Sequence, residues 1–227
     1  MTEAAIDTIN GVIRYPAPWN LTGKGYIILY RFPKDFTMAQ GLIPTFLSTS
    51  FTGGLGAVML VDYTESNVGP YGELLFIPGK FHFRGKKLHC ITKIYVSTRE
   101  SVENGWENWA IPKELADFRF TRPTNKKRRE KVVVTKDNEP IIDVVIQHGR
   151  LPFPIHTKLI PFPLLQEKDG KLYYTCFTGK GTARFSRIED ISVNPGLFPD
   201  IAPYRPLMAV RIDNFAITFP PSHVTDM

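Results

Sequence analysis

Apolar and β-branched residues recur along the chain in short runs that glycine and proline separate. The first strong run covers 25–32, and others follow at 57–63, 69–78 and 87–96. In the last of these runs, apolar and polar residues alternate with a period of two. Runs of this length, bounded by turn residues, are typical of β-strands.

The second half of the chain continues the same pattern. The connections between its early runs are too short for crossover helices, so we predict an antiparallel meander. Four prolines in 151–165 exclude a central strand and favour an extended loop. The strands predicted in this half cover 117–121, 131–135, 141–147, 171–178, 182–193 and 207–219.

Two short helices interrupt the strands. One is predicted from Pro33 to Leu42, and the other follows a capping Thr98 and is interrupted or ended by Gly105. Residues 1–24 have little periodicity and are interpreted as an N-terminal arm. About ten strands with two helices predict a mainly β fold with minor α content, in which an antiparallel sheet is curved or closed. We expect one domain over 1–227.

Length and charge limit the classes of function. A chain of 227 residues can bury a large core and an internal cavity. The net charge is +6, but the basic residues concentrate in the run 126–129, which lacks the interleaved aromatic residues that would stack on bases. We therefore expect no nucleic-acid partner and rank that alternative last.

The start of the chain contains acidic residues where a secretory signal needs basic ones, and no apolar stretch is long enough to span a bilayer. These features predict a soluble, cytoplasmic protein with no membrane partner. Cys90 and Cys176 lie in strand-like runs, where small thiols pack well; a disulfide between them stays open, but there is no disulfide framework.

Common cofactor and metal motifs are missing. The five histidines show neither zinc-ligand spacing nor pairing with the cysteines. The glycine sets 53–56 and 179–181 match neither the dinucleotide fingerprint nor the phosphate-loop spacing, and there is no nucleophile-elbow motif. We therefore predict no metal and no cofactor.

Lys113 is the first candidate for chemistry. It follows Pro112 directly and has apolar neighbours in Ile111, Leu115 and Ala116. Desolvation there would lower the pKa of the amine and free it as a nucleophile. The alternative is a lysine whose stem covers the core while its ammonium reaches water, and this stretch alone favours that alternative because buried lysines are rare.

Arg31 and Glu73 join Lys113 as candidates, each at or within a predicted strand. Taken singly, they are interpreted as a surface ion pair and an edge-strand carboxylate. Together, a neutral amine, a guanidinium that holds a carboxylate and a carboxyl that moves a proton would suffice for imine chemistry on a keto acid.

The order and spacing of several short motifs resemble the acetoacetate decarboxylase superfamily over about residues 25–120. The motifs are Val68–Leu74, the strand ending at Val96, Gly105-Trp106-Glu107, Pro112-Lys113, and the early strand ending Tyr30-Arg31. The resemblance implies a closed, cone-like barrel around an internal cavity, homo-oligomers and no external cofactor. It also implies that Lys113 forms the imine, Glu73 transfers protons, and Arg31 positions a substrate carboxylate or a water.

Two positions depart from the family pattern. Glu114 replaces a second lysine, and an anion close to Lys113 would raise its pKa, although neighbouring residues in extended structure point to opposite faces. Trp106 replaces an arginine. Tyr71, Phe76, Trp106 and Trp109 are the candidates for lining the substrate pocket, but aromatic residues in strands are also ordinary core.

The leading hypothesis is a Schiff-base lyase, most directly a decarboxylase, acting on a keto acid or related carbonyl compound. The same imine would serve an aldolase or a dehydratase. A third alternative is a non-catalytic binding protein that keeps the barrel and has lost the reactive amine, for which Glu114 is the motivation.

Overall fold

The computed structural model describes residues 7–124, 128–157 and 162–227. It is mainly β, as predicted, with helices α1 (Lys34–Gln40) and α2 (Arg99–Trp109) and the short 3-10 helix η1 (Thr45–Leu47). The strands are β1 (Thr8–Ile9), β2 (Val12–Ile13), β3 (Trp19–Tyr30), β4 (Phe51–Gly53), β5 (Gly56–Glu65), β6 (Tyr71–Ile77), β7 (Lys80–Phe83), β8 (Lys86–Leu88), β9 (Lys93–Val96), β10 (Lys113–Leu115), β11 (Asp117–Thr121), β12 (Arg129–Lys136), β13 (Glu139–His148), β14 (Phe153–His156), β15 (Pro163–Lys168), β16 (Lys171–Cys176), β17 (Thr178–Val193), β18 (Met208–Phe219) and β19 (His223–Asp226).

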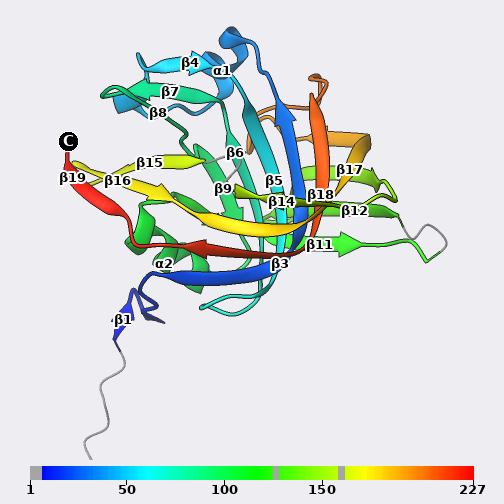
Figure 1. Cartoon of the computed structure of the whole chain (residues 1–227), viewed down its shortest axis with the longest axis horizontal. Coiled ribbons are helices and arrows are strands. Elements are labelled where there is room, and N and C mark those ends of the chain that lie inside the picture. Colours follow the sequence, from blue (N-terminus) through cyan, green and yellow to red (C-terminus); the bar gives the residue numbers. More distant parts are fainter. Residues whose placement is uncertain (1–6, 125–127, 158–161) are drawn as a thin grey trace, which may run out of the picture.

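One curved sheet dominates the molecule (Figure 1). Its strand order is β10-β9-β6-β5-β3-β18-β17-β13-β12-β11, and β14 pairs with β17 beside this path. All of these pairs are antiparallel except β10 with β9. The long strands β3, β17 and β18 carry register shifts, and such bulges increase the local twist with which a sheet curves.

The predicted closed barrel is not confirmed, because in the described residues the hydrogen-bonded path of the sheet ends at β10 and β11. These two edge strands are nevertheless consecutive in the chain, with only Ala116 between them. β10 is three residues long and pairs with β9, whereas β11 pairs with β12. The sheet therefore curls until its two edge strands, β10 and β11, meet through their covalent connection at Ala116. In the described residues, no hydrogen-bonded ladder joins these two strands.

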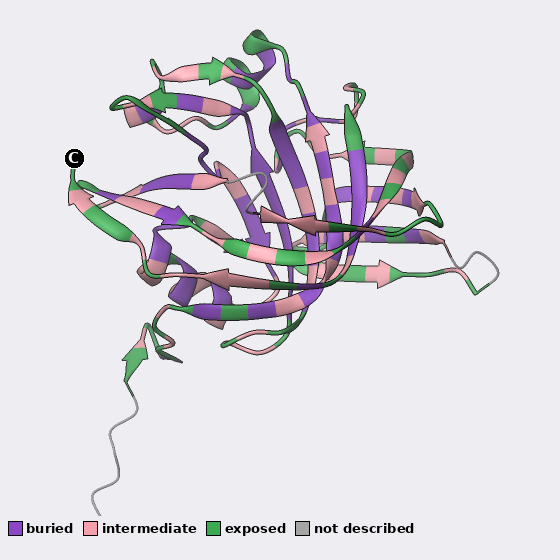
Figure 2. Ribbon diagram, in the orientation of Figure 1, coloured by how far each residue is buried: buried purple, intermediate pink, exposed green. Residues whose placement is uncertain are grey.

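Both faces of the central strands are buried, as Figure 2 shows. Every residue of β6 is buried, and its side chains alternate between two apolar clusters. Leu74 and Phe76 belong to one cluster together with Val132 and Ile142, whereas Tyr71 and Leu75 belong to the other. A strand packed on both sides reads as a continuous apolar run, so Glu73 in its middle needs a polar partner.

Two three-stranded sheets lie beside the main one, with orders β4-β7-β8 and β15-β16-β19 (Figure 1). Leu47, Phe81, Leu88, Leu165 and Leu172 form the apolar cluster shared by these smaller sheets. Among the described residues, no helix has the length and apolar character needed to cross a membrane.

The structure corrects the prediction for the N-terminal arm. Residues 19–24, assigned to the arm, form the first half of β3 instead. Trp19 and Leu21 alternate inward there, and this signal was hidden by Gly23 and the preceding prolines. The described residues before β3 do lie on another element without joining the main sheet: Asn104 of α2 donates to the Ile13 carbonyl and accepts from the Tyr15 amide, at 2.9 and 2.6 Å.

Three further boundaries differ from the prediction. The run 87–96 is broken into β8 and β9, because the segment around His89 leaves the ladder to bridge Leu164. The extended region 151–165 contains β14, which lies off the main path, and the start of β15, which is an edge strand. Both positions tolerate proline. The last strand, β19, was not predicted.

Candidate active site

A small cavity of about 30 Å³ lies between the main sheet, α2 and the end of β18. A buried water needs roughly 10–15 Å³ of such space, so this cavity has room for little more than one or two waters. Its lining is mostly apolar and contains two charged side chains, Lys113 and Glu73. The lining residues are Trp19, Leu21, Tyr63, Tyr71, Glu73, Leu75, Ile91, Ile94, Trp109, Ile111, Lys113 and Phe219.

Lys113 reaches this cavity because the chain reverses after α2. Thr98 caps the start of the helix by accepting from the Ser101 amide, and Ala110 ends it in the left-handed conformation, with φ of 53°. The Ile111 amide then donates back to the Gly105 carbonyl at 3.4 Å. Lys113 begins β10 and pairs with Ile94 of β9. Its side chain extends back over α2, where it lies against Ser101 and Gly105.

Two residues one helical turn apart receive that stem. Lys113 Nζ donates to Ser101 Oγ at 3.0 Å. Gly105 leaves the space that the lysine occupies, since a Cβ on this residue would lie 2.8 Å from both Cδ and Cε of Lys113. Gly105 therefore does not interrupt the helix, as the sequence had suggested, but makes room in it for the amine.

Glu73 faces the amine from β6. Its Oε2 lies 3.5 Å from Lys113 Nζ, and the side chains of the two residues are 6% and 4% exposed. Tyr63 of β5 donates its hydroxyl to Glu73 Oε1 at 3.1 Å. The carboxylate thus has the polar partners that its position in a fully buried strand requires.

Burial lowers the pKa of Lys113, while the negative charge of Glu73 acts in the opposite direction. Burial is the larger effect, so a greater fraction of the amine is neutral at physiological pH than for a free lysine. The pKa values of Tyr63 and Tyr71 are both raised well above the usual value, first by burial and then by Glu73. Both phenols are protonated at neutral pH and serve as hydrogen-bond donors.

Glu114 does not approach the amine. Its carboxylate accepts from Lys93 Nζ at 2.5 Å and from Lys136 Nζ at 2.7 Å, on the side of β10 opposite to Lys113. These two bonds and the charges of both lysines lower the pKa of Glu114 despite its partial burial. The alternation of side chains along a strand therefore removes the feature that argued against activation of Lys113.

Aromatic rings close the cavity. Trp19 and Trp109 meet edge to face with centroids 4.9 Å apart, and Phe219 lies 5.4 Å from Trp109. Trp109 Nε1 donates to the Pro220 carbonyl at 2.7 Å, which fixes the indole against the end of β18. Tyr71 also lines the cavity, and its ring centroid lies 5.2 Å from Lys113 Nζ. We call Trp19, Trp109 and Phe219 the aromatic wall.

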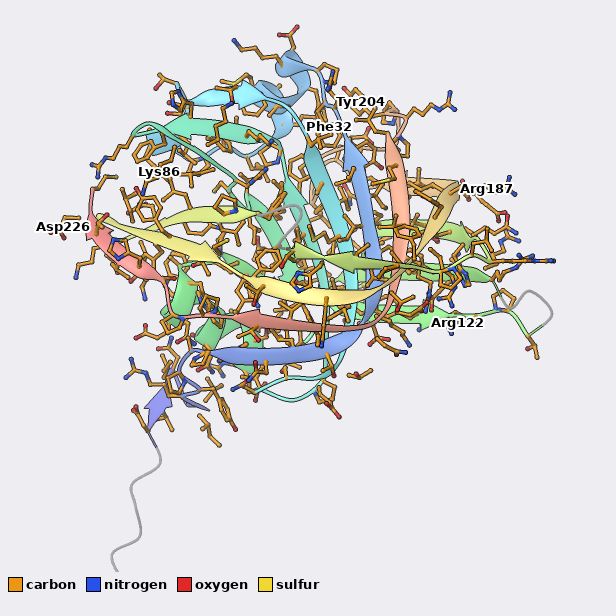
Figure 3. All side chains as sticks on the ribbon, in the orientation of Figure 1. Phe32, Lys86, Arg122, Arg187, Tyr204 and Asp226 are labelled. Atoms are coloured by element: carbon orange, nitrogen blue, oxygen red, sulfur yellow. The ribbon has the colours of Figure 1, made fainter. Side chains whose placement is uncertain are left out.

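Arg31 is not part of this site. It is exposed and directly follows β3, eight residues beyond Gly23, which pairs with Tyr63 at the level of the cavity. At about 3.3 Å per residue this is roughly 26 Å along the strand. In Figure 3 the neighbouring Phe32 lies at the end of the molecule away from α2. The structure therefore corrects the prediction that Arg31 positions the substrate: this residue lies far from the Lys113 cavity.

Two of the four predicted lining residues are also misplaced. Phe76 faces the cluster on the opposite side of β6, because it is an odd number of positions from Glu73. Trp106 is 38% exposed on α2, where the amine of Lys168 lies over its ring. Tyr71 and Trp109 do line the cavity.

Sequence reasoning missed Tyr63, Ser101, Gly105 as a packing partner, and two residues of the aromatic wall, Trp19 and Phe219. The four-residue spacing of Ser101 and Gly105 on one helical face was a usable signal. Tyr63 and the aromatic wall depend on contacts between distant segments, which no local pattern reveals. Within the described part of the chain, no three His, Cys, Asp or Glu residues group as a metal site would require.

The acetoacetate decarboxylase family matches this chain over residues 10–159. Comparison with curated proteins found no match. Among solved structures, acetoacetate decarboxylase from Legionella pneumophila subsp. pneumophila str. Philadelphia 1 is similar, with a TM-score of 0.75 and 16% identity, over 99% of this chain and 92% of that one.

Two further structures share the fold. The enduracididine biosynthesis enzyme MppR, complexed with pyruvate, has a TM-score of 0.68 and 15% identity over 96% of this chain and 94% of its own. An acetoacetate decarboxylase-like enzyme from Sphingomonas wittichii RW1 has a TM-score of 0.65 and 14% identity, over 93% of this chain and 94% of that one.

Proposed function

This chain belongs to the acetoacetate decarboxylase family, and from that premise we propose that it is an enzyme that forms a Schiff base between Lys113 and a small carbonyl substrate. One observation carries the proposal: the Lys113 side chain is 4% exposed and lines a cavity, and its amine faces a buried carboxylate at 3.5 Å. A lysine held only for solubility would extend its ammonium into water.

In the proposed reaction, the neutral Lys113 amine attacks the carbonyl carbon and forms a carbinolamine. Glu73 accepts the proton that the nitrogen loses and passes it to the former carbonyl oxygen, which becomes a hydroxyl group. A second proton, taken up from solvent, leaves with this hydroxyl group as water, and a protonated imine remains. The protonated phenol of Tyr63, bound to Glu73, holds the carboxylate in place during both transfers.

The protonated imine then accepts an electron pair. If the substrate is a 3-keto acid, the bond to the carboxylate breaks, carbon dioxide leaves and an enamine forms. Protonation of the enamine carbon and hydrolysis of the imine release the ketone and restore the amine. If the electron pair comes from a C–H bond next to the imine instead, the same enamine can attack an aldehyde, as in an aldolase, or expel a hydroxyl group, as in a dehydratase.

The lining favours a small substrate and gives only weak support for one that carries a carboxylate. Within the described residues, no guanidinium lines the cavity, and Glu73 would repel a substrate anion. Pyruvate is bound by the MppR structure, so we propose a small keto acid as the first substrate class. An uncharged aldehyde or ketone is the second, because the apolar lining would bind it without an unpaired charge.

Borohydride trapping tests the imine. Incubating the protein with borohydride and a panel of pyruvate, acetoacetate, acetone and butanal should add the mass of the reduced substrate at Lys113, as located by peptide mass spectrometry. Lys113→Arg is the matched control, since it keeps the charge and cannot form an imine. An unchanged intact mass with every carbonyl compound that is turned over would contradict the proposal.

Product analysis then separates the reactions. Release of carbon dioxide from acetoacetate identifies a decarboxylase, whereas exchange of the pyruvate methyl hydrogens with deuterium, without carbon dioxide, identifies the enamine of an aldolase or dehydratase. Ligand affinity that is the same in wild type and Lys113→Ala, together with a free-lysine pKa for Lys113, would favour a non-catalytic binding protein.

A further inference from the structure

A second concavity of about 600 Å³ opens at the other end of the main sheet. Figure 3 shows Arg122, one of its lining residues, at the end of the molecule opposite to Asp226 and away from α2. The concavity takes residues from β3, β17 and β18 and from the loops that flank β12 and β13. The lining residues are Lys24, Arg122, Arg128, His148, Gly149, Arg150, Arg184, Arg211, Asp213 and Asn214.

Positive charge exceeds negative charge in this concavity. Six of its lining side chains are lysine or arginine, and three carboxylates pair with them: Asp62 with Lys24, Glu130 with Arg122 and Arg211, and Asp213 with Arg184 and Arg211. The excess is therefore three positive charges. In the described part of the chain, the side chains of Arg128 and Arg150 form no ion pair.

The floor of the concavity is rigidly held. The side chain of Arg211 is 3% exposed, and its guanidinium contacts Glu130 and lies 2.8 Å from the Tyr26 hydroxyl. Its Nε donates to Asp213 at 2.7 Å. A register shift between Ile212 and Phe215 turns Asp213 and Asn214 toward the concavity, and Asn214 has a positive φ of 48°. An anion bound there would meet cations whose positions are already fixed.

His148 reports the field in the concavity. Burial lowers its pKa, and the charges of Arg211, Arg122 and Arg184 lower it further. A histidine whose protonation is opposed by three arginines lies in a positive potential. An anion bound beside it would cancel part of that potential and raise its pKa.

The lining also defines the chemistry of the ligand. Five of the six cations are arginines, whose planar guanidinium groups bind phosphate and carboxylate oxygens in pairs. Among the described residues, the lining has no phenylalanine, tyrosine or tryptophan ring on which a nucleobase could stack. The cations surround one concavity and do not form the extended stripe that a nucleic acid follows.

We propose that this concavity binds a compact, multivalent anion bearing phosphate or carboxylate groups, at a site separate from the Lys113 cavity. Arg128 and Arg150 supply the free guanidinium groups, and Arg211 with Arg184 forms the fixed floor. The proposal does not depend on imine chemistry.

Calorimetric titration with tripolyphosphate and with citrate at low salt tests the site and separates its two ligand chemistries. We expect one saturable site for at least one of these probes, and affinity about tenfold lower in the double variant Arg128→Gln/Arg150→Gln. Neither arginine forms an ion pair with another described residue, so the variant should fold normally. Arg187→Gln is the matched control: this arginine is 72% exposed on β17 outside the concavity and should leave affinity within about twofold of wild type.

NMR titration of His148 is the second measurement. Its pKa should rise when the probe binds to wild type, and this rise should be lost in the double variant. Failure of both probes to bind, or equal affinity in the double variant and Arg187→Gln, would overturn the proposal. So would affinity for single-stranded oligonucleotides that grows with their length, or self-association that blocks the probes. Borohydride trapping at Lys113 reports the other cavity independently.

Discussion

At the scale of single residues, the state of Lys113 depends on two opposed influences, burial and Glu73. Burial favours the neutral amine, whereas Glu73 favours the ammonium. In the proposed reaction, the neutral amine attacks the carbonyl and Glu73 also moves the protons of imine formation. Activation of the Lys113 amine would be stronger without the charge of Glu73, whereas proton transfer requires the Glu73 carboxylate. A substitution of Glu73 therefore separates these two effects.

We expect Glu73→Gln to lower the pKa of Lys113 further, because it removes the negative charge that raises it. The pH profile for acetylation of Lys113 should move to lower pH, since more amine is neutral at each pH. Turnover should nevertheless fall by about 10²-fold or more, as the proton carrier is lost. An acetylation profile that stays in place would show that Glu73 does not act on the amine.

Gly105→Ala should disable the amine without unfolding the protein. The new Cβ would lie 2.8 Å from two carbons of the lysine side chain, so Lys113 must move. Alanine favours helix by up to about 1 kcal/mol, which offsets part of the clash. We expect imine trapping to fall about tenfold or more, because displacing the amine by about 1 Å removes it from the position in which it can react.

Trp106→Ala is the matched control on the same helix, because Trp106 is exposed and does not line the cavity. Trapping should stay within about twofold of wild type, and circular dichroism should be unchanged for both variants. Equal trapping in Gly105→Ala and wild type would show that the lysine reaches the substrate from another position.

The sequence was informative about Lys113 and Glu73 and misleading about Arg31. The first two have apolar surroundings in the sequence itself, which correspond to burial in the structure. Arg31 was selected by resemblance, but it follows the end of β3 that lies away from the cavity. The predicted strand began at residue 25, whereas β3 begins at Trp19, so the prediction underestimated the distance between the two ends of the strand.

At the scale of elements, the aromatic wall closes the Lys113 cavity, and we expect it to decide which substrates can enter. It combines the start of β3, the end of α2 and the end of β18. The cavity behind it is far smaller than a keto acid with its water, so a ring of the wall must move when substrate binds. Phe219 is half-buried and is held by ring contacts, whereas Trp109 also donates a hydrogen bond.

Phe219→Ala should widen the range of carbonyl compounds that are trapped. Removing this ring enlarges the cavity, so trapping of a C6 ketone should rise relative to acetone, at a cost in unfolding free energy of about 1–3 kcal/mol for a half-buried phenylalanine. Phe177→Ala is the control, because Phe177 stacks on the same ring but does not line the cavity. If both variants keep the wild-type preference, the wall does not select substrates.

The pattern of short apolar runs and alternation predicted most strands, because at least one face of each strand is buried. It failed where the chain serves two sheets: the run 87–96 alternates throughout, yet the segment around His89 leaves the ladder to bridge β15. It also failed at Gly105, since a glycine in a helix reads as a break unless its packing partner is known.

At the scale of the whole molecule, His89 joins the main sheet to the smaller β15 sheet. Its amide donates to the Pro163 carbonyl at 2.9 Å, and its carbonyl accepts from Leu165 at 2.8 Å. The ring stacks on Phe162 with centroids 3.6 Å apart. Burial, and then Lys80, lowers the pKa of His89 from 6.5 to about 4.

This histidine predicts a loss of stability in acid. The folded state opposes protonation, so the unfolded chain binds the proton more readily between pH 6.5 and about 4. Unfolding free energy should fall as the pH drops through this window, by up to about 3 kcal/mol. Urea denaturation at pH 7, 5.5 and 4.5 measures the loss.

His89→Leu should flatten this dependence, because the variant has no proton to bind at the position. His82→Gln is the control, as His82 is an exposed histidine on β7. The same pH dependence in His89→Leu and His82→Gln would assign the acid sensitivity to other groups. A curved sheet was predicted from the number of strands, but the strand order and the open edges at β10 and β11 were not, because pairing between distant strands leaves no local signal.

The amine and two of the three rings of the aromatic wall come from different parts of the chain. Lys113, Ser101 and Gly105 belong to one continuous helix-and-strand segment, whereas Trp19 and Phe219 lie near the two ends of the sequence. Changes near the chain ends can therefore alter the accepted carbonyl compounds and leave the reactive group intact. If the aromatic wall selects substrates as we expect, Trp19 and Phe219 are the positions at which to begin engineering the substrate range.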